Sequence, residues 1–239
     1  MKSKIVIIIL VVISAITIFT SCEKIKGKGE VVTVTRTTAN YNSIDLAMSA
    51  TVYFTQGTDY TLQLSGQENV LTQVVTEVDG NQLVIRVKGG VILGSHEPIK
   101  VYVSAPSVSK LAVSGSGDIF IDNVLTAEKL SLDVSGSGSI NLGTVDLGHL
   151  VSHISGSGSI RAVSGTATRE DLNISGSGTV DIRNVEAATV YSTTSGSGET
   201  YIHATTLLDV TISGSGNVWY YGTPGINTHI SGSGNVKRM

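Results

Sequence analysis

Serine is the reactive side chain that this sequence of 239 residues spaces most regularly. The tetrapeptide Ser-Gly-Ser-Gly occurs seven times, at intervals of 18 to 21 residues, beginning at Ser114, Ser135, Ser155, Ser175, Ser195, Ser213 and Ser231. A nucleophilic serine needs a neighbouring base, and the strained G-x-S-x-G turn that often presents one does not occur here. A serine that returns in every repeat is therefore expected to be structural and not catalytic.

Acidic side chains can cleave a glycosidic bond only as a close pair, and the repeats do not supply one. The position two residues before each tetrapeptide holds Ala112, Asp133, His153, Asn173, Thr193, Thr211 and His229. The position four residues after its first serine holds Asp118, Ser139, Ser159, Thr179, Glu199, Asn217 and Asn235. If repeats stack about 4.8 Å apart, Asp118 and Glu199 lie about 19 Å apart, whereas glycosidase carboxylates are about 5 to 9.5 Å apart. We predict no catalytic residues.

The sequence also predicts no metal site and no cofactor. His149 and His153 share one side of a predicted strand but lie about 13 Å apart along it, too far for one zinc ion. Calcium-binding repeats need an aspartate in every nonapeptide, and here only Asp118 follows a glycine pair. A phosphate-binding loop needs a glycine turn that opens a helix, whereas these glycines lie between predicted strands.

The residues around each tetrapeptide alternate between apolar and polar, which indicates β-strands. Near Ser135, for example, Leu132, Val134, Ile140 and Leu142 have the same parity as the two glycines. A unit of this kind that recurs about every 20 residues indicates a solenoid, in which each coil buries its apolar side against the next. The predicted fold is all-β: a right-handed parallel β-helix with about 20 residues per coil and glycine bends between two sheets.

Glycine is expected at the bends because the two sheets approach there too closely for an inward side chain. A second turn in each coil is expected at a site such as Asp122-Asn123 or Gly165-Thr166. A flexible Gly/Ser linker would not keep aliphatic residues at fixed offsets beside seven tetrapeptides. The predicted structural bend residues are Gly115, Gly117, Gly136, Gly138, Gly156, Gly158, Gly176, Gly178, Gly196, Gly198, Gly214, Gly216, Gly232 and Gly234.

Residues 30–110 are strand-rich but less regular, and we expect them to form an irregular β cap on the first repeat. The alternation from Ile44 to Phe54 matches a degenerate coil, with Met48 and Ala50 where the bend glycines would be. Because no Pro-rich or charged linker intervenes, this cap and the seven-repeat β-helix of residues 111–239 are predicted to form a single domain.

Residues 1–21 have the pattern of a signal peptide: Lys2 and Lys4 precede an apolar run of 15 residues that ends at Phe19. Such a run is shorter than the roughly 20 residues that span a bilayer. Cys22, the only cysteine, is the candidate lipidation site, and residues 22–29 are predicted to be a lipidated polar tether. We expect a protein of the bacterial cell envelope that meets the membrane through this lipid anchor. The alternative is an ordinary cleaved secretory signal.

The charge balance excludes one class of partner. Removal of Lys2 and Lys4 leaves 14 basic and 19 acidic side chains, so the mature chain is negatively charged. There is no basic stripe with interleaved aromatic residues, and nucleic acid is therefore not an expected partner. The outward positions are mostly Ser, Thr and Asn, which favour polar or carbohydrate contacts.

The outward positions of the C-terminal repeats are the least uniform. The position six residues after each first serine holds Phe120, Asn141, Arg161, Asp181, Tyr201, Trp219 and Lys237, and the next outward position includes Arg183, His203 and Tyr221. Exposed aromatic rings beside Arg and Asp are typical of contact sites for proteins or sugars. The candidate binding patch comprises Arg161, Asp181, Arg183, Tyr201, His203, Trp219 and Tyr221, with a glycan or a protein as its ligand. The alternative is a stacking ladder that only stabilises the coils or covers the open C-terminal edge.

The chain resembles the head GIN domain family of bacterial secreted proteins and lipoproteins, described as auto-transporter adhesins. The resemblance covers residues 40–238 and rests on Tyr41-Asn42-Ser43-Ile44, on Glu77–Val87, on Ile99–Val103 followed by Pro106 and Leu111, and on the seven glycine bends. It implies a β-helix whose glycine motifs make the tight turns between sheets, an adhesive role, and no established catalytic residues.

We therefore expect a non-enzymatic, lipid-anchored envelope protein that is adhesive or binds a ligand. Two alternatives remain open. One is a structural envelope scaffold that self-associates through its open coil edge. The other is a carbohydrate-active enzyme, which the missing pair of acids disfavours.

Overall fold

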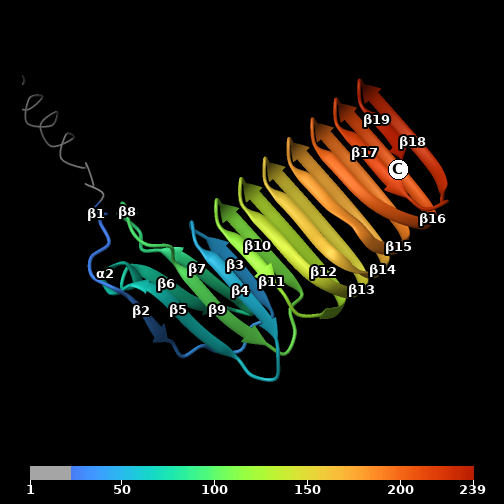
Figure 1. Ribbon diagram of the computed structural model, residues 1–239. Coiled ribbons are helices and arrows are strands. Elements are labelled where there is room, and N and C mark those ends of the chain that lie inside the picture. Colours follow the sequence, from blue (N-terminus) through green and yellow to red (C-terminus); the bar gives the residue numbers. More distant parts are fainter. Residues whose placement is uncertain (1–22) are drawn as a thin grey trace, which may run out of the picture.

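The computed structural model describes residues 23–239 as a stack of β-strands with an irregular cap at one end (Figure 1). The predicted signal peptide and Cys22 lie outside these described residues. The stack is a β-helix of about 6 turns with repeats about 20 residues apart, which confirms the predicted fold. Its strands are β10 (Lys110–Gly115), β11 (Asp118–Ile121), β12 (Leu125–Gly136), β13 (Ser139–Gly156), β14 (Ser159–Gly176), β15 (Thr179–Gly196), β16 (Glu199–Gly214), β17 (Asn217–Tyr221), β18 (Gly225–Gly232) and β19 (Asn235–Arg238).

A complete coil is almost one continuous strand that bends in three places. β13, for example, pairs in parallel with β12 on one side and with β14 on the other. One bend is the Ser-Gly-Ser-Gly tetrapeptide. Elsewhere the buried residues of β13 alternate, but they are three apart between Leu142 and Val145 and again between Leu147 and Leu150. The extra residue at each of these positions lets the chain turn while its apolar side stays inward.

The sequence predicted only one further turn in each coil, and the structure has two. Asp122-Asn123 does lie at a turn, between β11 and β12. Gly165 aligns with Val145, so Gly165-Thr166 lies beside the first of the two additional bends without interrupting β14. A strand of period two hides these corners in the sequence, because a single extra residue shifts the parity and a glycine does not mark the corner in every coil: β13 has Gly143 and Gly148 there, whereas β15 has none.

The tetrapeptide bends need glycine at both positions, for different reasons. The first glycine has a φ between +119° and +129° in all seven bends, a region that L side chains rarely adopt. At the second glycine a Cβ atom would press against the preceding coil: at Gly198 it would lie 2.6 Å from Ile174 Cγ2 and 3.0 Å from the Gly178 carbonyl oxygen. The crowding therefore comes from the neighbouring coil and not, as the sequence suggested, from the facing sheet.

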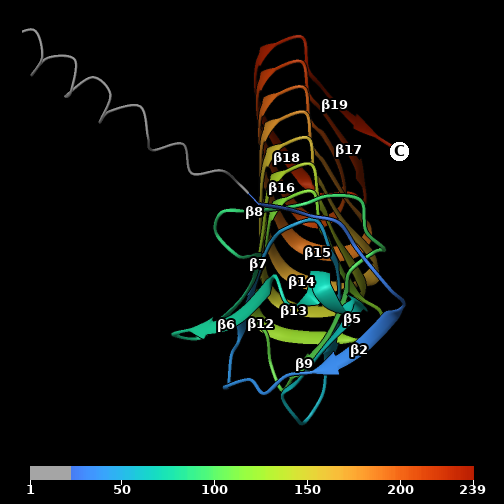
Figure 2. The same cartoon turned by 90° about the vertical axis from the view of Figure 1, so that its left-hand side faces the viewer.

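Backbone hydrogen bonds continue through these bends, which stack on one another in the end-on view (Figure 2). The N–H of Ser157 donates to the carbonyl of Gly136 at 2.9 Å, and in the next coil Ser177 donates to Gly156 at 2.9 Å. The residue after the second glycine continues the series, since Thr179 donates to a carbonyl of the preceding bend at 3.0 Å. The bend thus turns the chain without leaving these polar backbone groups unpaired.

Residues before the first tetrapeptide continue the stack and match the degenerate coil expected from the alternation. β3 (Ser43–Ala47) pairs in parallel with β10, and β4 (Thr51–Gln56) with β11. Met48 and Ala50 lie between β3 and β4 and are buried. The N–H of Asp118 donates to the Ala50 carbonyl at 2.9 Å, just as N–H groups of later bends donate to glycine carbonyls.

Beyond this coil, the parallel stack ends in an antiparallel cap. β7 (Gln82–Val87) and β9 (Lys100–Ala105) still pair in parallel with β3 and β4. β6 pairs antiparallel with β7, and β5 pairs antiparallel with β9 and β2. Leu64 of β5 and Val70 of α2 are fully buried, so these elements close the N-terminal end of the core. The capping elements are β2 (Val31–Thr35), β5 (Thr61–Gln67), α2 (Glu68–Leu71) and β6 (Val74–Asp79).

The segment that the sequence suggested as a polar tether lies along this cap. β1 (Glu23–Ile25) pairs in parallel with β8 (Val91–Leu93), and the N–H of Gly27 donates to the Ser95 carbonyl at 2.9 Å. Among residues 23–239, no helix has the length and apolar character needed to cross a membrane.

The last repeats are 18 residues apart because the first additional bend loses three residues and the second gains one. Asp181 aligns with Tyr201, but further along the same strand pair Thr189 aligns with Leu207. The chain is therefore shortened between Tyr201 and Leu207, away from the glycine bend, which keeps its geometry.

One acidic side chain lies inside the β-helix. Glu170 aligns with Leu150 and Val190 of the neighbouring coils and is fully buried. Neither carboxyl oxygen has a hydrogen-bond partner among the described residues, and burial raises the pKa of this carboxyl well above its usual range. The Glu170 carboxyl is therefore neutral at pH values where an exposed glutamate is charged. Its parity with Leu172 was the signal in the sequence that it points inward.

Gly176→Ala is expected to lower the free energy of unfolding by about 1 to 3 kcal/mol. The new Cβ would sit at a φ of +121° and 2.5 Å from the Gly156 carbonyl oxygen. Gly57→Ala is the matched control, because a Cβ at Gly57 would meet nothing within 4 Å. Thermal unfolding followed by circular dichroism measures both variants. Equal melting temperatures for the two would contradict the proposed strain at the bend.

Glu170→Val, which copies Val190 of the next coil, is expected to stabilise the fold. The folded pKa of Glu170 is raised, so wild-type stability falls as pH rises from the unfolded pKa of about 4.3 towards the folded value. The gain should reach about 1 to 3 kcal/mol near neutral pH and be smaller at pH 4.5. Thermal unfolding at both pH values provides the comparison, and a gain independent of pH would show that this carboxyl does not titrate as described.

Candidate functional site

The outward side chains form columns along the stack, and the strand register reproduces the columns inferred from the repeats. In the column six residues after each first serine, Phe120 aligns with Asn141, Asn141 with Arg161, and Arg161 with Asp181. The same column continues from Tyr201 to Trp219. Two candidate surfaces follow from this register, one on each side of the tetrapeptide bends.

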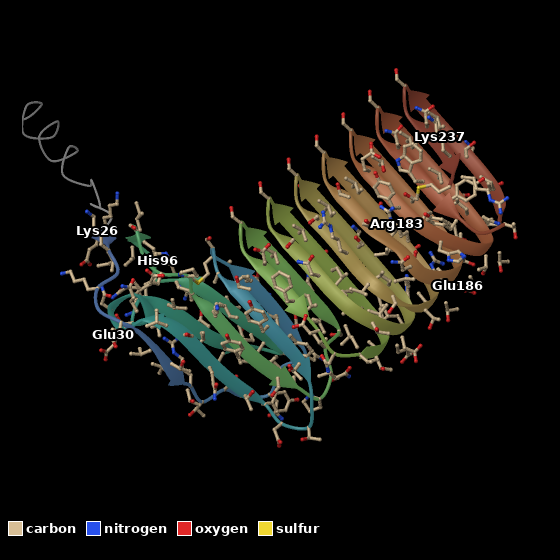
Figure 3. The ribbon with its side chains drawn as sticks, in the orientation of Figure 1. Lys26, Glu30, His96, Arg183, Glu186 and Lys237 are labelled. Atoms are coloured by element: carbon tan, nitrogen blue, oxygen red, sulfur yellow. The ribbon has the colours of Figure 1, made fainter. Side chains whose placement is uncertain are left out.

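On the first surface, Asp181, Arg183, Tyr201 and Trp219 of the predicted patch are in contact. Arg183 donates hydrogen bonds of 2.7 and 2.9 Å to Asp181, and its guanidinium carbon lies 4.2 Å from the centre of the Tyr201 ring. The Tyr201 and Trp219 rings stack with centroids 6.3 Å apart and planes 9° apart. The Lys237 ammonium lies 5.3 Å from the Trp219 ring centre, and Figure 3 shows Arg183 and Lys237 on the same side of the stack. The ring of Tyr201 is therefore covered by Arg183 and Trp219, and the ring of Trp219 by Tyr201 and Lys237.

Trp219 is also held at its polar end. Its indole Nε1 donates to Glu199 Oε2 at 2.8 Å, and Asn217 Nδ2 donates to Glu199 Oε1 at 2.7 Å. Glu199 thus fixes two side chains of the following coil. Such coil-to-coil contacts are those of a stacking ladder, the alternative that the sequence left open.

His203 and Tyr221 lie beside this row. Tyr221 aligns with His203, and their ring centroids are 6.3 Å apart. His203 aligns with Glu186 and not with Arg183, because the register shifts between β15 and β16. The prediction of one outward column through Arg183 and His203 is therefore wrong. Arg161 is exposed and has the column position expected for it.

A second aromatic stack lies at the N-terminal end of the same column. The rings of Tyr102 and Tyr53 are 5.2 Å apart, and those of Tyr53 and Phe120 are 5.8 Å apart. This stack was not predicted, although Tyr53 has outward parity between Val52 and Phe54, which was the available signal.

The second surface is a groove on the other side of the bends, with a volume of about 470 Å³. One rim carries Asp133, His153, Asn173 and Thr193, from the column two residues before each tetrapeptide. The other rim is formed by the first serines of five tetrapeptides, from Ser114 to Ser195. At about 4.8 Å per coil, the groove is about 19 Å long. The sequence identified this column but suggested no binding role for it.

A charged cluster adjoins the groove. Asp171 accepts a hydrogen bond of 2.8 Å from Arg169, and His149 Nε2 lies 2.6 Å from its other oxygen. The Arg169 guanidinium carbon lies 4.6 Å from the centre of the Tyr191 ring. Burial raises the pKa of the Asp171 carboxyl, but the hydrogen bonds from Arg169 and His149 outweigh it and lower this pKa overall. Asp171 is therefore charged at neutral pH, in a hollow of about 400 Å³ that shares three rim residues with the groove.

This arrangement is suited to binding. Within residues 23–239 there is no group of three or more His, Cys, Asp or Glu side chains that could hold a metal ion. Asp118 and Glu199 share a column but are separated by four strand pairings. The hydroxyl, amide, imidazole and carboxylate groups of the groove can donate and accept hydrogen bonds along an extended ligand.

Solved structures of similar fold come from Bacteroides and Parabacteroides species. A putative adhesin from Bacteroides fragilis matches 90% of this chain and 100% of its own, with 25% identity and a TM-score of 0.86. A putative lipid binding protein from Parabacteroides distasonis matches 91% of this chain and 100% of its own, with 26% identity and a TM-score of 0.77. A putative adhesin from Parabacteroides merdae has 22% identity and a TM-score of 0.74 over 91% of this chain and 99% of its own, which shows a shared fold. No curated protein matches the sequence.

One family model matches residues 40–224. This range holds the degenerate coil, six of the seven bends, the groove and every residue of the candidate patch. The match covers most of the chain, and it confirms the resemblance found in the sequence. The chain belongs to the family described as "putative auto-transporter adhesin, head GIN domain".

Proposed function

We propose that this protein is a non-enzymatic adhesive protein of the bacterial envelope, anchored by a lipid on Cys22, and that it binds an extended ligand in the groove. The observation that carries the proposal is the register of the groove rim. Four successive coils place Asp133, His153, Asn173 and Thr193 in one line, opposite a line of serine hydroxyls. The family to which the chain belongs is described as an adhesin, and no enzyme is named in that description.

The geometry of the groove favours an extended ligand over a compact one. Its polar groups recur about every 4.8 Å along the solenoid axis, so successive units of a glycan or of an extended peptide would each meet a similar pair of side chains. The groove is open along its length and lies on a rigid stack of hydrogen-bonded coils. Binding therefore costs little ordering of the protein itself.

The aromatic patch is the second candidate surface. A sugar that stacks on an aromatic ring needs a free ring face, and the faces of Tyr201 and Trp219 are covered by Arg183, by each other and by Lys237. What remains exposed are ring edges and the exposed Arg161 in the same column, which suit a protein contact better than a stacked sugar. We therefore assign the ligand to the groove and a stabilising role to the patch.

His153→Ala and Asn173→Ala, alone and together, should weaken ligand binding, because each removes a polar group from the centre of the groove rim. We expect the double variant to bind at least about tenfold more weakly, which corresponds to about 1.4 kcal/mol. Asn184→Ala, at an exposed corner of β15 outside the groove, is the matched control. The measurement is binding of the purified protein to arrays of glycans and matrix proteins and to phospholipid vesicles, since one similar structure is that of a putative lipid binding protein.

Unchanged binding of the double variant to every ligand that the wild type captures would refute the groove as the site. Release of reducing sugar from a bound glycan would favour a carbohydrate-active enzyme instead. Absence of any captured ligand, with self-association intact, would favour the structural scaffold.

Trp219→Ala should lower the melting temperature and leave groove binding within about twofold. The variant loses the stack on Tyr201 and the hydrogen bond to Glu199, together worth about 1 to 3 kcal/mol. Thermal unfolding and the same binding arrays give both readouts. The reverse result, lost binding with an unchanged melting temperature, would move the ligand site to the aromatic patch.

Cys22→Ser should release the protein from the membrane, because two or three acyl chains at about 0.8 kcal/mol for each buried CH₂ are then lost. Fractionation of cells into membrane and soluble parts, with detection of the protein, tests this. Equal membrane retention of wild type and variant would refute the anchor without bearing on the groove.

A further inference from the structure

The C-terminal end of the β-helix is open, whereas the N-terminal end is capped. In the described part of the chain, β18 pairs only with β16, and β19 only with β17. Ile226 and Ile230 of β18 align with Leu208 and Ile212, inward residues that are at most 1% exposed. Ile226 and Ile230 are 42% and 43% exposed. The last coil thus leaves apolar core residues uncovered at the free edge seen beside the C-terminus in Figure 1.

Within β18, this edge lacks the features that usually prevent strands from pairing; the charged residues of the last coil, Lys237 and Arg238, lie in β19. Natural edge strands are protected by charged side chains, prolines, bulges or a covering element. From Gly225 to Gly232, β18 contains no Lys, Arg, Asp, Glu or Pro, and all eight of its residues are exposed. At the other end of the stack, Leu64 of β5 and Val70 of α2 cover the core. The C-terminal edge is therefore free to accept another strand.

The sequence of β18 is complementary to itself in an antiparallel pair. About Thr228 the polarity is symmetrical, with Asn227 and His229 on the outer face and isoleucines at 226 and 230 on the inner face. Antiparallel pairing centred on Thr228 would set Ile226 of one copy against Ile230 of the other, and Thr228 against itself. No charged pair would oppose the pairing of β18 with β18, because this strand carries no acid, lysine or arginine.

We propose that two copies of this chain join end to end through β18, in an antiparallel pair centred on Thr228, and form a twofold dimer with a continuous apolar core. We expect a second copy of this chain to bind at the edge, because its C-terminal end has the same cross-section and the same symmetrical strand. A twofold contact of this kind is closed, so it stops at two copies. β1 lies at the far end of the stack from β18 (Figure 1), so the two copies of β1 would lie at opposite ends of the dimer. If the anchor at Cys22 proposed above is correct, such a dimer would join two membrane surfaces.

The test uses the full chain with Cys22→Ser, so that an introduced cysteine is the only thiol. In the proposed dimer the two copies of residue 228 face each other with Cα atoms about 4.5 to 5.5 Å apart, within reach of a disulfide. Thr228→Cys should therefore form a covalent dimer on mild oxidation. Ser231→Cys is the matched control, because the two copies of residue 231 would be about 20 Å apart. Thr228→Lys, which sets like charges on the twofold axis, should weaken the uncrosslinked dimer at least tenfold in sedimentation equilibrium.

A covalent dimer from Thr228→Cys alone supports the proposal. It is overturned if both cysteine variants crosslink equally, if neither does, or if the wild type forms open-ended filaments, which would indicate a head-to-tail contact. None of these outcomes depends on the groove or on the anchor, so failure of the dimer and failure of the proposed function are distinguishable.

Discussion

Every coil of this protein has to reverse direction at the Ser-Gly-Ser-Gly bend while lying in register on the coil before it. Two requirements meet there. The first glycine has a positive φ, which L side chains rarely adopt. At the second glycine there is no room for a Cβ atom, because Ile174 and its counterparts fill the inside of the corner. Glycine meets both requirements and leaves the peptide groups free to bond from coil to coil, with Ser157, Ser177 and Ser197 each donating to the first glycine of the preceding bend. The stack can therefore be hydrogen-bonded through its sharpest corner, which an ordinary loop would interrupt.

This repetition determines what the surface can do. A side chain at a given outward position lies beside the side chain at the same position in the coils before and after it. The functional groups on the surface therefore form columns along the stack. On one side of the bends the column is aromatic and cationic, and its members cover each other from Arg183 to Lys237. On the other side its rim side chains are mostly small and polar, and they leave open a groove that Val134, Ile154 and Ile174 also line. The first arrangement places side chains of successive coils in contact, and the second leaves side chains open to solvent.

Much of the fold and of the outward columns could be predicted from the sequence, because the repeat fixes the register between coils. Once the tetrapeptides were aligned, the partners of Asp118, Glu199 and Trp219 followed by counting. The alignment of His203 with Glu186 could not be predicted, because β16 loses residues at a corner that carries no glycine signal. The additional bends were hidden because the glycines Gly143 and Gly148 at these corners of β13 have no counterparts in β15, and a spacing of three among inward residues resembles ordinary variation. The groove could not be predicted, because a line of Asp, His, Asn and Thr side chains has no sequence signature of its own.

The bend also explains the contrast between the two ends of the molecule. Met48 and Ala50 replace the glycines in the degenerate coil. On the N-terminal side of this coil in the stack, the parallel repeat ends and the strands pair in an antiparallel cap. The last bend, at Gly232 and Gly234, keeps the repeat geometry; among residues 23–239 β18 pairs only with β16, and Ile226 and Ile230 are exposed. A solenoid that keeps its repeat to the last coil presents a surface onto which an identical coil can be added.

Native-state hydrogen exchange at the amides of Ser157, Ser177 and Ser197 tests the central claim most directly. These serines have exposed side chains in a Gly/Ser-rich segment, yet their N–H groups donate to carbonyls of the coil before them at 2.8 to 2.9 Å. We predict protection as strong as that of the core strands, with exchange only through opening of whole coils. Exchange at the rate of an exposed linker would contradict the account, because the bends would then not be part of the hydrogen-bonded stack.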